Sequence, residues 1–512
     1  MTRQQNRQGL IITGLLLGIF AAAIDNTIVA TAMGTIVANL GGLEKFVWVT
    51  SAYLVAEMAV MPIFGKLSDM YGRKRFFILG ISLFLLGSIL CGTAQNIVEL
   101  SIYRAIQGIG GGALMPIAFT IMFDVVPLEK RGSMSGFFGA VFGASSLIGP
   151  LLGAYLTDYL DWRWIFYINV PIGLIALALI LLSYHESAEH VRQRIDWWGA
   201  ATLVGSIVCL MFALELGGQS YAWNSSVIIG LFTAAAVFLA VFLAVETKAS
   251  EPIVSYAMFR ERLFAASTVT SLFYGAGFII FTMFIPLYVQ GVTGGTATNS
   301  GLILLPLTLS SVAASQIGGF LATKTSYRNI MLFSALVFGI GTFLLSTLTP
   351  DTPRWLLTVF MIIAGFGAGF SFSVLGMASI HSFDMRQRGS ANSTLAFVRS
   401  LGMTVGLTVF GIIQRNALAG KIGGAFGGLN GESFGDVRGL LTPEGRASVS
   451  KEMMDTIVGF LSSSIASMYL WALVLPVLAF AAILFMGNAR MVIPGKEPTG
   501  EPPTAVAEAG SQ

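Results

Sequence analysis

Three ionisable side chains lie inside long apolar stretches of this sequence, where a charge is expensive. Asp25 interrupts the run AAIDNTIVATAM, Glu57 lies near the middle of a second run, and Arg104 stands near the start of a third. A charge in hydrocarbon costs several kcal/mol unless it is paired or hydrated, so such residues indicate a functional site. Burial also disfavours the charged form of a carboxylate. Asp25 is therefore a candidate proton carrier, and Glu57 is a candidate partner for a proton or a cation.

The neighbours of these residues indicate how they are held. Thr50, Tyr53 and Glu57 follow one another at steps of three and four, so they share one helical face, which we expect to line a cavity. Arg104 precedes Gln107 and a glycine run in RAIQGIGGG, in which Gly108 and Gly112 allow another helix to approach closely. Two alternatives remain open: Arg104 could extend to the outer membrane surface, and Glu57 could pair with Arg104 in a structural role.

Composition shows that membrane helices must position these side chains. Of the 512 residues, 55% are hydrophobic and 11% are charged, and the mean hydropathy is +0.78. A soluble domain carries about 25% charged residues, so this chain is not soluble. Cys91 and Cys209 lie in apolar runs as packing residues and predict neither a disulfide nor a metal site. The net charge of +3 comes from loops and does not indicate nucleic-acid binding, and we find no P-loop for ATP-driven transport.

A spanning helix needs about 20 mostly apolar residues. The first apolar run extends beyond the core of a secretory signal, so we keep it as a helix. The predicted spans are 10–32, 47–67, 76–95, 98–121, 134–157, 164–183, 197–217, 226–246, 264–290, 299–322, 330–348, 355–380, 391–413 and 462–488.

Lys and Arg residues orient these fourteen helices. With the N-terminus in the cytoplasm, most of the 29 basic residues fall on the cytoplasmic side, as the positive-inside rule requires. An even number of spans then places the C-terminus there too. The long outer loop 414–461 begins glycine-rich, which predicts irregular backbone, and from Pro443 on it looks like an extension of the last helix. The proline-containing tail is expected to be disordered.

An internal repeat divides the chain. The tripeptide Arg-Gly-Ser at 131–133 recurs at 388–390, and Gly149 and Gly406 follow the two copies at equal distance. Such repeats are typical of transporters built from two related bundles. We expect these divisions: a cytoplasmic N-terminus at 1–9, a six-helix bundle at 10–190, two inserted helices at 191–250, a second six-helix bundle at 251–490, and the tail at 491–512.

Local motifs resemble a known family. The segment GKLSDMYGRKRF, with Gly65, Asp69, Gly72, Arg73 and Lys74, resembles the signature of major facilitator transporters between their second and third helices. RAIQG resembles a second pattern of that superfamily. The stretch SSLIGPLLG, with Gly149, Pro150 and Gly153, resembles the motif of exporters that exchange substrate for protons. DNTIV, from Asp25, and WRWIFYINVPIG, from Trp162, resemble signatures of the fourteen-helix drug:proton antiporters.

This resemblance implies an all-α integral membrane protein with the major facilitator fold, fourteen helices and no enzymatic activity. It implies a proton-coupled multidrug efflux antiporter that exports amphipathic, often cationic, compounds by alternating access. Asp25, Glu57, Arg104 and Tyr53 would serve proton coupling and substrate binding, and the segment containing Asp69 would gate the cytoplasmic side, with Asp124 as a possible partner of its basic residues. The expected partners are the lipid bilayer, small amphipathic molecules and protons. No cofactor, metal or nucleic acid is expected, and we expect a monomer in a bacterial plasma membrane.

Some assignments stay open. A narrow exporter of one antibiotic, metabolite or lipid would share every motif, whereas a proton-coupled uptake symporter is disfavoured by the Gly149-Pro150 element, and a channel by the repeat. Arg399 is a cation within a helix of the second bundle, in which we find no acid at membrane depth, so proton coupling should rest on the first bundle. Aromatic side chains of one helix could line the cavity or belong to the core: Tyr274, Phe278, Phe281 and Tyr288.

Overall fold

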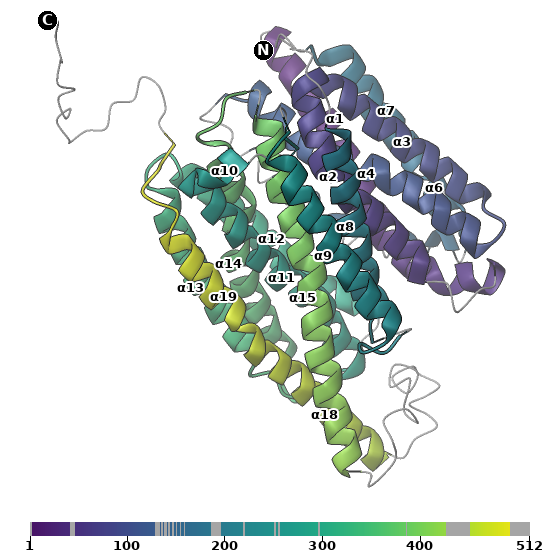
Figure 1. Ribbon diagram of the computed structural model, residues 1–512. Coiled ribbons are helices and arrows are strands. Elements are labelled where there is room, and N and C mark those ends of the chain that lie inside the picture. Colours follow the sequence, from purple (N-terminus) through teal and green to yellow (C-terminus); the bar gives the residue numbers. More distant parts are fainter. Residues whose placement is uncertain are drawn as a thin grey trace, which may run out of the picture.

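The chain folds into long helices that run nearly side by side (Figure 1). The structure is a computed structural model. It describes the chain apart from residues 1–2, 41–46, 128–133, 186–195, 219–220, 250–251, 254–255, 295–296, 386, 426–450 and 492–512, and apart from scattered positions from 135 to 158.

The first half contributes one group of helices, drawn in purple and blue (Figure 1). In the described residues these are α1 (Arg3–Leu40), α2 (Val47–Tyr71), α3 (Arg73–Thr93), α4 (Ile97–Val125), α6 (Trp164–Tyr167) and α7 (Asn169–Ser183). Helix α4 packs against α2 on one side and α3 on the other, and α1 packs against α7. The second half forms a separate group, made by α10 (Tyr256–Arg260), α11 (Arg262–Gly291), α12 (Ala297–Leu321), α13 (Tyr327–Leu345), α14 (Arg354–Ile380), α15 (Arg388–Ala425), α18 (Lys451–Ala472) and α19 (Val474–Leu484).

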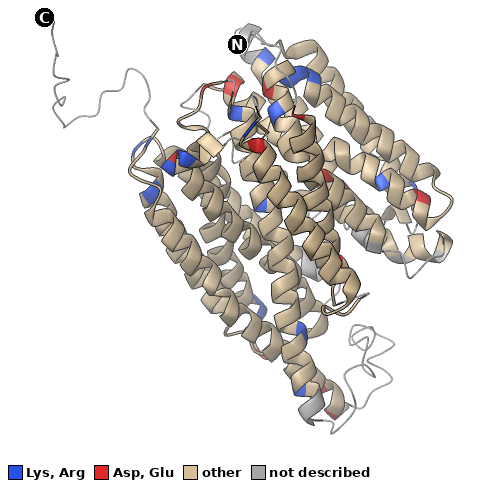
Figure 2. Ribbon diagram, viewed as in Figure 1, with Lys and Arg blue, Asp and Glu red and all other residues tan. Residues whose placement is uncertain are grey.

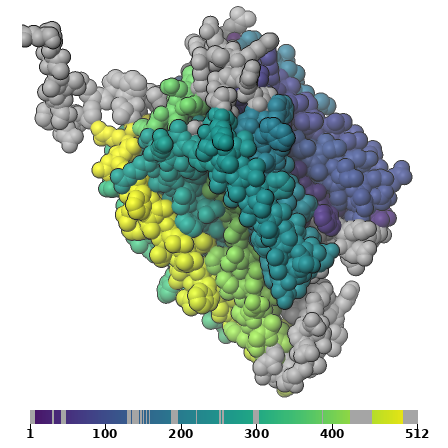
Figure 3. Space-filling view, viewed as in Figure 1, coloured from purple at the N-terminus to yellow at the C-terminus, as the bar shows by residue number. Residues whose placement is uncertain are grey.

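Two further helices lie at the junction of the halves. Helix α8 (Trp197–Leu216) packs against α2 and α15, and α9 (Ser226–Glu246) packs against α8. The space-filling view shows this teal pair on the surface between the purple-blue and the green-yellow parts of the chain (Figure 3). Their apolar contact with α2 includes Val55, Met58 and Ala59. The two helices agree with the predicted spans 197–217 and 226–246.

Thirteen helices of the described residues are long and apolar enough to cross a membrane. All thirteen overlap a predicted span, and eleven of them agree with it at both ends within four residues. The remaining predicted span, 134–157, falls in a segment that is described only in part. Its described residues, from Met134 to Thr157, are helical. The outer surface carries exposed large apolar side chains such as Leu182 and Trp471, as a lipid-facing surface requires. Charged residues gather near the helix ends, above all at the end where α1 begins and α19 ends (Figure 2).

The long helices extend further than hydropathy predicts. Helix α1 already includes residues assigned to a cytoplasmic N-terminus, and it continues to Leu40 rather than 32. Helix α15 continues to Ala425, so the prediction of irregular backbone from residue 414 is wrong for 414–425. The helical extension before the last span is present from Lys451 onward. The rest of that loop and the tail from 492 lie outside the described residues.

Two predicted helices are each interrupted, the first near its start and the second near its middle. Helix α6 ends at Tyr167 and α7 begins at Asn169, while α18 ends at Ala472 and α19 begins at Val474. Pro171 and Pro476 each follow the last residue of the preceding helix by four positions. A proline cannot donate to the carbonyl four residues earlier, and its ring clashes with it, so the interruption lies where this chemistry requires one.

Candidate substrate and proton site

The strongest polar feature of the first half is a buried ion pair between Asp25 of α1 and Arg104 of α4. Both residues are 0% exposed, and Arg104 Nη1 contacts Asp25 Oδ2. Arg104 is therefore deep in the bundle, and the alternative that it extends to the outer surface is wrong. The alternative pairing of Arg104 with Glu57 is also wrong, because the cation meets Asp25 instead.

Three neutral polar side chains complete this centre. Gln107 Nε2 and Asn169 Nδ2 each donate to Asp25 Oδ1 at 2.9 Å, and both amide nitrogens also lie within 2.9 Å of Ser88 Oγ. Gln107 Oε1 in turn accepts from Arg104 Nη1 at 2.7 Å. We call Asp25, Arg104, Gln107, Asn169 and Ser88 the Asp25 cluster. Both carboxylate oxygens of Asp25 are thus engaged, Oδ1 by two amide donors and Oδ2 by Arg104.

The sequence analysis missed two members of the cluster. Asn169 is quoted within WRWIFYINVPIG without a role, and Ser88 lies unremarked in the apolar run of α3. Asn169 offers a signal that could have been used, because it is the one amide within a strongly apolar helix start. Ser88 offers none, since a serine in a membrane helix is usually satisfied by its own backbone.

Helix α4 can reach these partners because its glycines let it approach α2 closely. A Cβ on Gly108 would overlap the carbonyl oxygen of Tyr53, and one on Gly112 would overlap that of Glu57. The predicted close contact through Gly108 and Gly112 is thus confirmed, and its partner is α2. The close approach also brings the Tyr53 ring to 4.2 Å from the Arg104 guanidinium carbon, within the range of a cation–π interaction.

Glu57 differs from Asp25 in its surroundings. It is half-buried on α2, one turn beyond the fully buried Tyr53, and no ion pair joins it to any described residue. An acid at this depth without a fixed counter-charge can accept a proton or a cation from outside the protein. The structure brings Asp25, Arg104 and Tyr53 together directly, and it leaves Glu57 beside them on the same helix as Tyr53.

A second polar cluster joins the two halves at the end where α2 passes into α3 and α15 begins. Asp69 lies 3.0 Å from Arg73, and Arg73 also pairs with Asp124. Asp69 accepts hydrogen bonds from the backbone N–H groups of Gly389 at 3.0 Å and Ser390 at 2.8 Å. These two residues begin α15, so the carboxylate sits at a helix N-terminus, where negative charge is favourable. The contact expected between Asp124 and the basic segment is present.

The remaining residues of that motif have local roles. A Cβ on Gly65 would overlap the Ser393 side chain, so this glycine lets α2 and α15 meet. Gly72 lies between α2 and α3 and has φ 114°, a backbone conformation that glycine adopts readily and residues with a Cβ rarely do. Lys74 Nζ donates to the carbonyls of Leu181 at 2.8 Å and Tyr184 at 2.6 Å at the end of α7. Each position of the motif thus fixes one contact between helices.

The antiporter-like motif is described only in part. A Cβ on Gly149 would overlap Thr27 Oγ1, and that hydroxyl donates to the Ser145 carbonyl at 3.0 Å, so this segment packs tightly on α1 two residues from Asp25. Gly153 is buried. Pro150 lies outside the described residues, and with it the predicted kink.

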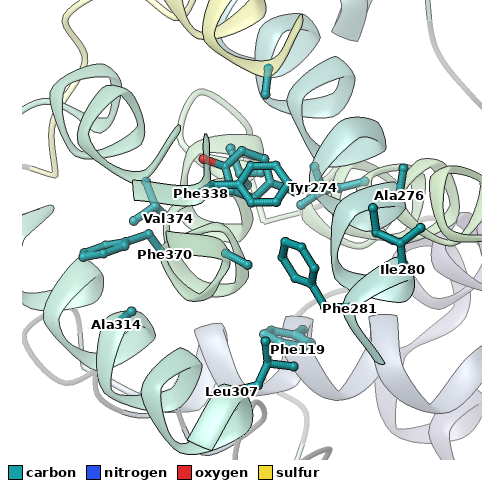
Figure 4. Close-up of a cluster of buried hydrophobic side chains, with 14 of the residues drawn as sticks. Phe119, Tyr274, Ala276, Ile280, Phe281, Leu307, Ala314, Phe338, Phe370 and Val374 are labelled. Atoms are coloured by element: carbon teal, nitrogen blue, oxygen red, sulfur yellow. The ribbon is translucent and has the colours of Figure 1, made fainter. Parts of the chain in front are cut away.

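The aromatic residues of α11 mostly belong to the core. Tyr274, Phe281 and Tyr288 are at most 1% exposed, and Tyr274 stacks on Phe338 with ring centroids 5.0 Å apart. Figure 4 shows Tyr274, Phe281 and Phe338 packed closely together among other apolar side chains. Phe278 alone of the four is half-buried. The structure therefore favours the core alternative for the other three.

Comparisons with known proteins agree with this architecture. The family model described as Major Facilitator Superfamily matches residues 15–196 and 187–407. Multidrug resistance protein 3 of Bacillus subtilis is 55% identical over 96% of this chain and 97% of its own, and Multidrug transporter protein MdtP of the same organism is 38% identical over 82% and 77%. A solved structure of the proton:xylose symporter XylE, 14% identical, superimposes with a TM-score of 0.61 over 95% of this chain and 97% of its own. That likeness concerns the fold alone.

Proposed function

The chain belongs to the major facilitator superfamily, and from that premise we propose that it is a proton-coupled multidrug efflux antiporter. It exports amphipathic, often cationic, compounds by alternating access. Multidrug efflux is supported by the 55% identity to Multidrug resistance protein 3 over nearly the whole chain. Proton coupling is supported by one observation above all: a fully buried Asp25–Arg104 pair in the first half.

Asp25 carries the coupling proton in this proposal. When Asp25 is ionised, the ion pair is formed and the negative charge of Asp25 compensates the positive charge of Arg104. A proton on Asp25 removes the negative partner and leaves Arg104 with Gln107, the Val49 carbonyl at 3.2 Å from Nε, and the Tyr53 ring. Breaking a buried pair costs about 3–5 kcal/mol. One proton crossing about 100 mV releases about 2.3 kcal/mol, and each pH unit adds about 1.4 kcal/mol. A gradient of about 100 mV and one pH unit therefore supplies free energy of the same size as this cost.

Glu57 binds the cationic part of the substrate in the same scheme. It shares a helix with Tyr53, whose ring covers Arg104, so a change in the Asp25 cluster can reach it through one side chain. A charged Glu57 holds a cation, and its protonation releases the cation. The six-plus-two-plus-six division, with both termini in the cytoplasm of a bacterial cell, is part of this proposal. The cluster of Asp69 and Arg73 then closes the cytoplasmic end.

Replacing Asp25 with asparagine tests the proposal. Asparagine keeps the size of the side chain and removes the proton site, so export driven by a pH gradient should fall to the background rate in proteoliposomes loaded with a fluorescent amphipathic cation. Downhill counterflow of the same dye should persist, because the change leaves Glu57, to which cation binding is assigned, in place. Asp161→Asn is the matched control, since Asp161 is a half-exposed acid near an outer loop. Gradient-driven export at the wild-type rate by the Asp25 variant would disprove the assigned role.

A further inference from the structure

The second half contains one buried cation that the proposed mechanism does not use. Arg399 lies on α15 and is 7% exposed. Its side chain passes Gly275 of α11 and reaches α14, where Nη2 donates to the Ser371 carbonyl at 3.0 Å. Its guanidinium carbon stands 5.1 Å from the centre of the Phe372 ring. Three helices of the second half therefore meet around this one charge.

No acid compensates Arg399 among the described residues. None of the ion pairs includes it, its Nε has no acceptor, and the sequences of α11, α12, α13, α14 and α15 contain no Asp or Glu. Arg104 in the first half is also buried, at 0% exposed, but it pairs with Asp25. A carbonyl and an aromatic face offset only part of the cost of burying a charge. The guanidinium group of Arg399 thus has an N–H, at Nε, that no described residue accepts.

The surroundings of Arg399 differ from the closed aromatic core beside it. Phe372 is half-buried, and so is Phe278, which meets it edge-on at a centroid distance of 5.3 Å. Tyr274 and Phe281, on the same helix as Phe278, are at most 1% exposed. Helix α15 also packs against α2, which carries Glu57. Arg399 and this pair of aromatic rings therefore lie at the edge of the second-half core, and the helix that carries Arg399 adjoins the first half.

We propose that Arg399 binds an anionic group of the transported compound, above all a carboxylate. Guanidinium groups match carboxylates in shape and charge, and the two half-buried rings beside Arg399 suit the aromatic part of the same molecule. Together with Glu57, this site selects amphipathic compounds that carry both a carboxylate and a cation, which extends the substrates beyond simple cations. The proposal rests on the export function proposed above.

A matched pair of probes isolates this interaction. The first is a cationic aromatic dye of the rhodamine type with a free carboxylate, and the second is its methyl ester. Gradient-driven export of each is measured in proteoliposomes with wild-type protein and with Arg399→Gln, Arg399→Lys and Arg415→Gln. Arg415 lies on the same helix but is exposed, and it donates to the Gly218 carbonyl at 2.8 Å, so it controls for losing an arginine from α15.

We expect Arg399→Gln to raise the KM for the carboxylate dye about tenfold or more, since hydrogen bonds to charged groups are among the stronger ones. The ester should keep its wild-type KM. Arg399→Lys should give an intermediate KM for the carboxylate dye, because it keeps the charge but not the planar fork. Arg415→Gln should alter neither dye.

Equal effects of Arg399→Gln on both dyes, or no effect on either, would overturn the proposal. If that variant is not recovered in the membrane, the wild-type protein and Arg399→Lys decide. A wild type that exports the ester but shows no saturable export of the carboxylate dye would also overturn it. A wild type that exports neither dye in response to a pH gradient would instead disprove the proposed export function, so the two failures are distinguishable.

Discussion

Replacing Asp69 with asparagine perturbs the contact that joins the two halves. The Asp69 side chain is 1% exposed, and its two oxygens accept from the N–H groups of Gly389 and Ser390 and from Arg73 Nη2. Asparagine keeps the shape but has one oxygen, so its NH2 group must face a donor at the start of α15. The Arg73–Asp124 pair remains in place.

The geometry sets the size of the effect. A hydrogen bond to a charged group contributes about 1.5–3 kcal/mol, against about 0.5–1.5 kcal/mol for a neutral one. Two backbone donors therefore lose about 2 kcal/mol together, and the charge at the helix N-terminus contributes about 0.3–1 kcal/mol more. A total of about 2–3 kcal/mol shifts the equilibrium between joined and separated halves by roughly 30- to 150-fold.

Hydrogen exchange at the start of α15 measures this shift directly. The amides of Gly389 and Ser390 are protected by Asp69, so in the variant a peptide that covers them should exchange roughly 30-fold faster or more. Turnover of a fluorescent substrate should fall while its apparent affinity changes little, because Asp69 lies at the end of α2, far along the helix from Glu57.

The control is again Asp161→Asn, which removes an acid that is 49% exposed. It should leave exchange at the start of α15 unchanged. Unchanged exchange of Gly389 and Ser390 in the Asp69 variant would refute the argument that a carboxylate holds this helix. A large loss of substrate affinity at an unaltered turnover rate would refute the gating role.

Three further substitutions probe other parts of the scheme. Glu57→Gln should raise the KM for cationic substrates about tenfold and leave neutral ones unchanged, as uptake assays with a cationic and a neutral dye would show; equal losses would point to coupling or structure instead. Asn169→Ala removes a donor to a buried carboxylate worth about 1.5–3 kcal/mol, so thermal unfolding of the purified protein should begin at a lower temperature and export of all substrates should slow alike; an unchanged unfolding curve would contradict this. Pro150→Leu should let a pH gradient dissipate without net pumping, which leak measurements in vesicles would detect; pumping at the wild-type ratio would reduce the motif to packing.

Most of the helical framework was readable from the sequence. A membrane span is a local property, because every backbone group must be satisfied within one helix and every side chain of the span must tolerate hydrocarbon. The positions of Asp25 and Arg104 were equally informative, since a charge in an apolar run demands a partner. The ends of a few helices were not predicted, as the continuation of α1 to Leu40 and of α15 to Ala425 shows. Hydropathy detects the hydrocarbon region, whereas a helix ends where its own hydrogen bonding stops.

Only the tertiary structure decided which partners meet. Asp25 and Glu57 were both possible counter-ions for Arg104, and the rotation of α1, α2 and α4 about their axes selected Asp25. The same packing brought Asn169 and Ser88 to the carboxylate, and it placed Asp69 on the first N–H groups of a helix 320 residues later in the chain. Among the residues that the structure describes, it also left Arg399 without an acidic partner. Sequence spacing fixes which residues share a face of one helix, but contacts between helices depend on how closely their small residues let them approach, as Gly65, Gly108 and Gly112 do here.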